Sequence, residues 1–282
     1  MEIGNNIKSE FSLLDKSITK KSSKCFKLFA DYNNYSFSYS LFNIEKNEFQ
    51  SVHSYIFEKN NSNLKYLFNF SKMLKWNLNS FTISYFFKPC TIIPNSLYDS
   101  KLKRKYLELN NQIDSNEEVL VDKLKYLNAV IIYSIPKEHL RILKKIKNIK
   151  LRHSATIFIE NILKKTKHSN SNEFFIDVST KNFNIAFIKN SKLVFYNNFE
   201  FKSKDDFLYY ILNCYNTLEI NSREVNVRIS GEFEKNSVIS DLKSYIKKVL
   251  LVNRSSSNSY SYILNQVPNH FFQKLFNQIN CE

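Results

Sequence analysis

The sequence predicts an α/β fold made of two similar halves, each with a mixed β-sheet flanked by helices. Residues 173–201 read as three short apolar strands separated by polar turns, and Phe183, Ile185 and Phe187 occupy every second position of the middle strand. Residues 25–57 show the same alternation of aromatic side chains with serines. Period-two alternation between tight turns is typical of an antiparallel meander with one buried face.

A constant offset relates the two meanders. Asp31 and Asp177 each end a first strand at a polar turn, and they lie 146 residues apart (177 − 31). Because a slip of one residue would turn every side chain to the opposite face, a constant offset over this length predicts an internal duplication. The same offset aligns Phe37 with Phe183, Leu41 with Phe187, Phe49 with Phe195, Tyr55 with Phe201, Phe81 with Val227 and Ile83 with Ile229.

Length and composition agree with two domains. The chain has 282 residues, of which 43% are hydrophobic, and contains 25 Phe and 17 Tyr. A domain holds roughly 150 residues, and this apolar content is enough for two cores. We place the first domain at 1–155 and the second at 156–282. Because only 2 glycines are present, most tight turns must use Asn, Ser or Asp.

The other elements of the first half follow from periodicity and turn residues. Residues before 24 read as a polar lead-in. Pro136 is expected in the first turn of a helix, where its missing N–H costs nothing. Helical spacing is found at 63–76, at 97–109 and from 136 to 146, and strands are expected at 81–85, 91–93, 119–121, 129–133 and 149–152.

The second half follows the same plan. Ser154 is expected to cap a helix, and Ser203 with Asp206 approximates a capping box for the helix after the second meander. Pro268 precedes a closing amphipathic helix at 268–280, which we expect to pack against a domain, with the first domain as one option, because its apolar surface is costly to expose. Between these lie a strand at 225–229, a helix at 238–246 and a strand at 249–252.

The chain is strongly basic, with a formal net charge of +15. Clusters of lysine and arginine lie at 101–105 and 144–152. Such clusters are typical of solvated faces, and they also predict a weak, salt-sensitive attraction to nucleic acids.

Cysteines, histidines and apolar runs give no sign of a metal centre or a membrane anchor. The 4 cysteines and 5 histidines are too widely spaced for a metal-ligand pattern or a catalytic triad. No apolar run approaches the length of a membrane span, and the N-terminus lacks a signal region. We therefore expect a cytoplasmic protein with reduced thiols, no metal site and no catalytic residues.

The order of elements resembles a known superfamily. Meander, helix, strand, helix and strand, used twice, is the plan of the actin, Hsp70 and sugar-kinase proteins, whose ribonuclease H-like domains enclose a cleft. The resemblance is carried over nearly the whole chain by FFIDVSTKNFNIAF, its counterpart LFADYNNYSFSYSL, and VNVRISGE ending at Glu232. The chain is similar to an uncharacterised bacterial family with an actin-like ATPase fold, and more distantly to the pilus assembly protein PilM and the division protein FtsA.

The resemblance implies positions for a nucleotide. Two turns, each after an aspartate, would cradle phosphates, and a glycine pair would lie against the adenosine. Glycine is used there because backbone N–H groups must approach the phosphates without an intervening Cβ. This chain departs from that pattern with Asn33, Ser179 and Glu232 in place of glycines. The matching positions are Asp31, Asn33 and Asn34, then Asp177, Ser179 and Thr180, then Ser230 and Gly231.

Three functions follow from these observations. The missing glycines favour a non-catalytic actin-fold module that binds a protein partner and needs no cofactor. One alternative is an ATP-binding protein or weak ATPase that uses Asp31 and Asp177 with magnesium. The other is a nonspecific nucleic-acid binder.

Overall fold

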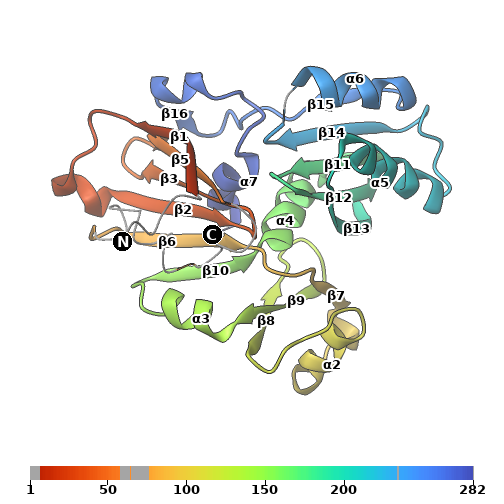
Figure 1. Cartoon of the computed structure of the whole chain (residues 1–282), viewed down its shortest axis with the longest axis horizontal. Helices are drawn as coiled ribbons and strands as arrows, with labels where there is room; N and C mark the ends of the chain where they lie inside the picture. The colour runs from red at the N-terminus through yellow and green to blue at the C-terminus, as the bar shows by residue number, and fades with distance from the viewer. Residues whose placement is uncertain (1–6, 58–63, 65–75, 234, 282) are drawn as a thin grey trace. The chain divides into compact units, whose positions relative to one another are not determined.

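The computed structural model describes residues 7–57, 64, 76–233 and 235–281. The chain divides into two compact units (Figure 1). The first unit comprises Met1–Ile157, Ser255–Gln266 and Leu275–Glu282, and the second comprises Phe158–Arg254 and Val267–Lys274. Within the described residues, no helix is long and apolar enough to cross a membrane. The helix expected at 63–76 lies almost entirely outside the described residues.

An eight-stranded sheet forms most of the first unit. Its main path runs β1-β5-β3-β2-β6-β10, and β4 joins β3 to β16. β2 and β3 pair antiparallel, whereas β2 and β6 pair parallel, so the sheet is mixed. The strands are β1 (Ile7–Leu14), β2 (Phe26–Tyr32), β3 (Ser36–Asn43), β4 (Glu48–Phe49), β5 (Ser51–Phe57), β6 (Ser80–Tyr85), β10 (Ile149–His153) and β16 (Ser259–Tyr260).

The polar lead-in expected before residue 24 is wrong. Residues Ile7–Leu14 form β1, which pairs antiparallel with β5. Only Phe11 and Leu13 alternate with a polar residue there, which is too short a pattern to indicate a strand without its partner.

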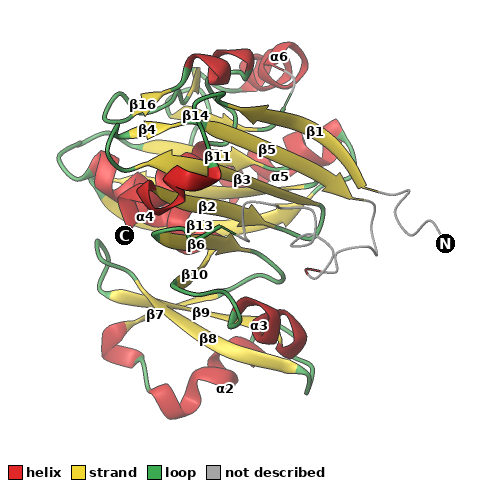
Figure 2. Cartoon of the chain, turned by 90° about the vertical axis from the view of Figure 1, so that its left-hand side faces the viewer, coloured by secondary structure: helices red, strands yellow, loops and turns green. Residues whose placement is uncertain are grey.

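A second, three-stranded sheet in this unit has the order β7-β9-β8 (Figure 2). Its strands are β7 (Thr91–Pro94), β8 (Glu117–Lys123) and β9 (Ala129–Pro136), with α2 (Lys103–Glu108) and α3 (Lys137–Leu143) beside them. The single helix expected at 97–109 is wrong, because two 3-10 turns at Asn95–Leu97 and Ser100–Leu102 precede α2. The Asp99 side chain accepts the backbone N–H of Lys101 and so caps the second turn separately.

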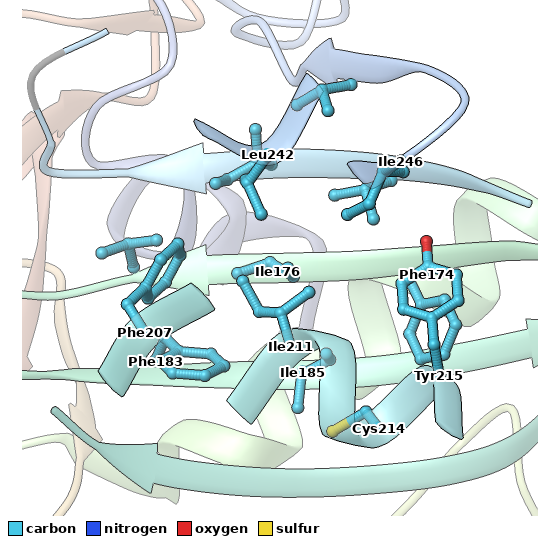
Figure 3. Packing of buried hydrophobic residues seen from close by; sticks show 14 of the residues in the cluster. Phe174, Ile176, Phe183, Ile185, Phe207, Ile211, Cys214, Tyr215, Leu242 and Ile246 are labelled. Atoms are coloured by element: carbon cyan, nitrogen blue, oxygen red, sulfur yellow. The ribbon is translucent and has the colours of Figure 1, made fainter. Parts of the chain in front are cut away.

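The second unit is a five-stranded mixed sheet with the order β13-β12-β11-β14-β15. Its core lies between this sheet and the helices α5 and α6, and within it Phe174 and Tyr215 have ring centroids 4.2 Å apart (Figure 3). The predicted capping box of Ser203 and Asp206 is confirmed at the start of α5. Its helices and strands are most of α4 (Ser154–Thr166), whose first four residues belong to the first unit, and β11 (Glu173–Val178), β12 (Asn182–Lys189), β13 (Lys192–Glu200), α5 (Lys204–Thr217), β14 (Asn226–Gly231), α6 (Lys235–Tyr245) and β15 (Val249–Leu251).

The C-terminal segment is buried, as its apolar composition predicts, but it is not one helix. α7 (Gln273–Phe276) is a single turn, followed by a 3-10 helix at Asn277–Cys281. Phe272 has a φ of 57°, which ends any helix begun at Pro268. In the first unit, Phe276 is 1% exposed and packs edge-on against Phe49 at 4.8 Å.

The two sheets have the same register at their aspartates. The neighbours of Asp31 are Ser84 on β6 and Ser38 on β3, and those of Asp177 are Ser230 on β14 and Asn184 on β12. The offset of 146 residues (230 − 84 and 184 − 38) relates each neighbour in the first sheet to its counterpart in the second.

Candidate functional site

Asp31 lies in a polar row across the large sheet of the first unit. The parallel pairing of β2 with β6 places Ser84 beside it, and the antiparallel pairing with β3 places Ser38 on its other side. Ser84 and Ser38 are 0% and 4% exposed, and Asp31 itself is half-buried. Gln278 reaches the same strand from the C-terminal segment and donates its Nε2 to the carbonyl of Ala30 at 2.7 Å.

Asn33 closes the turn that follows Asp31. Its side-chain Oδ1 accepts the backbone N–H of Tyr35 at 2.8 Å and that of Ser36 at 2.9 Å. Its Nδ2 donates to the Ser36 hydroxyl at 2.7 Å, and the residue is 2% exposed. An asparagine that bonds the backbone two and three residues on forms an Asx turn. The N–H groups of Tyr35 and Ser36, at the end of the turn that follows Asp31, are therefore bonded to the protein's own carboxamide.

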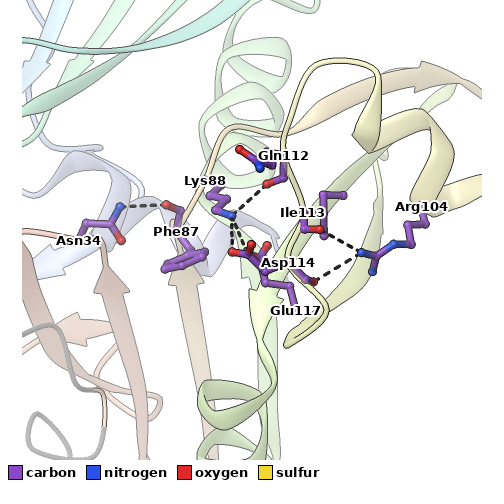
Figure 4. A network of polar contacts seen from close by, with 8 residues as sticks. All are labelled: Asn34, Phe87, Lys88, Arg104, Gln112, Ile113, Asp114 and Glu117. Carbon is purple, nitrogen blue, oxygen red and sulfur yellow. Dashed lines mark hydrogen bonds and ion pairs between the residues drawn. The ribbon is translucent and has the colours of Figure 1, made fainter.

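Asn34 is hydrogen-bonded to the segment that follows β6. Its Nδ2 donates to the carbonyl of Phe87 at 2.9 Å (Figure 4). The next residue, Lys88, pairs with Glu117 and donates to the carbonyl of Gln112 at 3.0 Å. The first turn is thus bonded to a segment that is itself fixed by a buried carboxylate.

Asp177 is the penultimate residue of β11 in the second unit and is 4% exposed. The hydroxyl of Ser230 donates to its Oδ1 at 2.7 Å. The ammonium Nζ of Lys274 lies 3.9 Å from its Oδ2, and the Lys274 and Asp177 side chains are 7% and 5% exposed. Asp177 therefore has both a hydroxyl donor and a buried counter-charge within its own unit.

The turn after Asp177 is also bonded internally. The backbone N–H of Ser179 donates to the carbonyl of Asn182 at 2.8 Å, and Thr180 is half-buried at the tip. Behind the turn, the Oδ1 of Asn184 accepts the Tyr196 hydroxyl at 2.8 Å. This turn resembles the first in using polar side chains where the resemblance implied glycine.

Gly231 is required by packing within the sheet. Its φ is 111°, and a Cβ at this position would lie 1.9 Å from the carbonyl oxygen of Val178. Its N–H donates to the carbonyl of His270 at 2.8 Å, and the N–H of Glu232 donates to the carbonyl of Val178 at 3.0 Å. Both N–H groups of the predicted adenosine motif are therefore bonded to the protein backbone.

The sequence matches the family model described as "Protein of unknown function (DUF3822)" over residues 15–249. The chain belongs to this family. No curated protein matches it.

Two solved structures establish the fold. A Bacteroides thetaiotaomicron protein with an actin-like ATPase fold and unknown function has a TM-score of 0.79 and 24% identity, covering 94% of this chain and 99% of that chain. A chain of the PilM–PilN type IV pilus biogenesis complex has a TM-score of 0.63 and 8% identity, covering 91% and 98%. The actin-like ATPase fold, the resemblance to the bacterial family of that fold and the more distant likeness to PilM are therefore confirmed.

An actin-like ATPase fold implies MgATP as a cofactor, and the contacts around these positions in the DUF3822 chain do not fit it. A phosphate cradle needs backbone N–H groups that point at the ligand. Here Asn33 accepts those of Tyr35 and Ser36, and the protein backbone accepts that of Gly231. The Lys274 ammonium stands beside Asp177, where repulsion disfavours a second cation. Among the described residues, no cluster of three or more His, Cys, Asp or Glu side chains could hold a metal ion.

The structure places the predicted residues in two groups. Asp31, Asn33 and Asn34 lie together in the first unit, and the other five lie together in the second. Sequence reasoning missed Lys274, His270 and Gln278, which reach these groups from the C-terminal segment. No local pattern marks them, because each acts on a strand far away in the sequence.

Proposed function

We propose that this chain is a non-catalytic actin-fold protein that binds a protein partner and works without a nucleotide. The observation that carries the proposal is the Asx turn of Asn33, whose carboxamide oxygen accepts the N–H groups of Tyr35 and Ser36 in the turn that would cradle a phosphate. Catalysis of phosphoryl transfer depends on such preorganised donors aimed at the developing charge. Donors already bonded inside the protein cannot supply that stabilisation.

The second unit supports the same proposal. Gly231 packs so closely on the backbone of Val178 that no larger residue fits there. A glycine at this position is therefore required by the sheet itself and does not indicate an adenosine site. Glu232 follows Gly231 and adds a carboxylate at the position where the adenosine would lie. The shared register at Asp31 and Asp177 supports descent from a duplicated ATPase domain, in which both aspartates persist as turn residues.

Two observations favour a protein partner. One structural neighbour belongs to the PilM–PilN complex, in which a protein of this fold is assembled with another protein. The first unit also exposes large apolar side chains, with Leu97 at 68% and Leu109 at 77%. The hydroxyl of Tyr106, on α2, donates to the carbonyl of Leu97 at 2.6 Å, which ties the backbone at Leu97 to this helix. Exposed apolar groups of this kind mark interaction sites when they are clustered.

Calorimetric titration of MgATP into the full chain tests the proposal. We expect no saturable, magnesium-dependent heat, and we expect Asp31→Ala and Asp177→Ala to behave like the wild type in this titration. Weak heat that fades with salt equally in all three proteins reflects the net charge of +15 and supports the proposal. Saturable binding in the wild type that both variants abolish would overturn it in favour of an ATP-binding protein.

A further inference from the structure

Lys274 is a buried lysine at the site of a buried aspartate. Lysine is almost never fully buried unless it is paired. Its side chain is 7% exposed, that of Asp177 is 5% exposed, and the Nζ–Oδ2 distance is 3.9 Å. Ser230 donates to the other carboxylate oxygen at 2.7 Å, so the ammonium and the hydroxyl divide the two oxygens between them.

We infer that Lys274 is a resident cation of the Asp177 site, an ammonium group built into the chain that takes the place of a divalent metal ion. This inference rests on the proposed function and names what fills the ligand position of the second unit. A carboxylate buried at a strand end needs a positive charge or several donors to stay ionised. In this chain the charge is covalently attached, so the Asp177 carboxylate has a counter-charge without a bound ion.

The segment Val267–Lys274 is held in place by contacts at the residues that precede the lysine. Arg254 donates to the carbonyl of Val267 at 2.9 Å, and Gly231 donates to that of His270 at 2.8 Å. The His270 ring lies 4.8 Å from that of Phe233, and Phe272 is 4% exposed. The backbone that carries Lys274 is thus fixed by these contacts, which keeps its ammonium group near Asp177.

A double-mutant cycle tests the pairing. Removing one partner of a buried ion pair leaves an uncompensated charge, whereas removing both leaves none. We expect Asp177→Asn and Lys274→Met each to lower the Tm by roughly 10 °C. The double variant is expected to lose clearly less than the sum of the two single variants. Lys243→Met, at an exposed lysine of the same unit, is the matched control and should leave the Tm within about 1 °C. Additive losses in the cycle would overturn the inference.

The effect of divalent cations on the Tm tests whether Lys274 occupies a cation position. A lysine that only stabilised the fold would not alter this effect when it is replaced. Lys274→Ala removes the ammonium and leaves the Asp177 carboxylate without it. We expect Mg²⁺ or Mn²⁺ to raise the Tm of this variant but not that of the wild type or of Asp177→Asn/Lys274→Ala. An equal response of all three proteins, or no response of Lys274→Ala, would overturn the inference. MgATP binding by the wild type would instead refute the proposed function, so the two failures are distinguishable.

Discussion

Asn33 binds two backbone N–H groups with one oxygen, and replacing it with alanine removes that acceptor from the buried residues Tyr35 and Ser36. An unsatisfied buried donor costs about 1–3 kcal/mol, so we expect Asn33→Ala to lower the free energy of unfolding by about 2 kcal/mol or more. Urea denaturation of the full chain measures this loss. Asn34→Ala is the control, because it removes a single bond to the carbonyl of Phe87 and should cost less. Equal losses in the two variants would contradict the Asx-turn explanation.

A buried histidine gives the first unit a dependence on pH. His53 is 6% exposed and stacks on Tyr39 at 4.7 Å, and burial lowers its pKa from 6.5 to about 4. Because the folded-state pKa lies below the unfolded value, the unfolded state binds protons first as the pH falls. The stability that the neutral ring contributes is fully present above about pH 6.5 and is lost as the pH falls toward 4. The total loss of unfolding free energy is about 3 kcal/mol.

Replacing this histidine should flatten that dependence. We expect His53→Gln to show a smaller fall in the free energy of unfolding than the wild type between pH 6.5 and pH 4, whatever its absolute stability. His168→Gln, at an exposed histidine, is the control and should follow the wild type. Parallel curves for His53→Gln and the wild type would show that burial of this ring does not govern the acid response.

At the scale of elements, the C-terminal segment makes contacts in both units. Residues Val267–Lys274 belong to the second unit and Leu275–Glu282 to the first. Deleting 268–282 removes Phe272, Leu275 and Phe276 from their cores and exposes the surfaces that they cover. We therefore expect the truncated chain to lose its cooperative thermal transition and to aggregate. A truncated chain that unfolds cooperatively near the Tm of the full chain would contradict this expectation.

Elements with a long local pattern could be predicted, and elements fixed by distant contacts could not. The alternation in β3 and β12 is complete within each strand, which is why the sequence places both correctly. β1 needs β5 beside it, and the closing helix fails because Phe272 adopts a φ of 57°. The same limit applies to the site. Asp177 is visible as a strand end, whereas its partner Lys274 becomes adjacent only when the second unit has folded.

At the scale of the whole molecule, charge is uneven along the chain. Residues 137–152, which include α3 and β10, carry 7 basic residues and 1 acidic residue, and most of the basic ones are exposed. Arg152 is paired with the buried Asp122 at 3.9 Å, which removes it from the solvated set. The remaining basic residues, five lysines and Arg141, can attract phosphate groups of a nucleic acid. Contacts to phosphates do not distinguish one base sequence from another.

Binding to nucleic acid should therefore be weak and nonspecific. Each phosphate contact contributes about 0.9 to the slope of log K against log salt concentration, so Lys144→Glu/Lys147→Glu should lower that slope by about 2. Fluorescence anisotropy with a labelled duplex of arbitrary sequence, over a series of salt concentrations, measures it. Lys189→Glu/Lys192→Glu changes the charge equally in the hairpin of β12 and β13, and it should alter the slope less. Charge reversal at either pair lowers the net charge of +15 by the same amount. A larger change of slope for the first pair would therefore come from the basic residues at 137–152 and not from the overall charge. Tight binding that persists at 0.15 M salt and prefers one sequence would show that base contacts exist which these lysines cannot make.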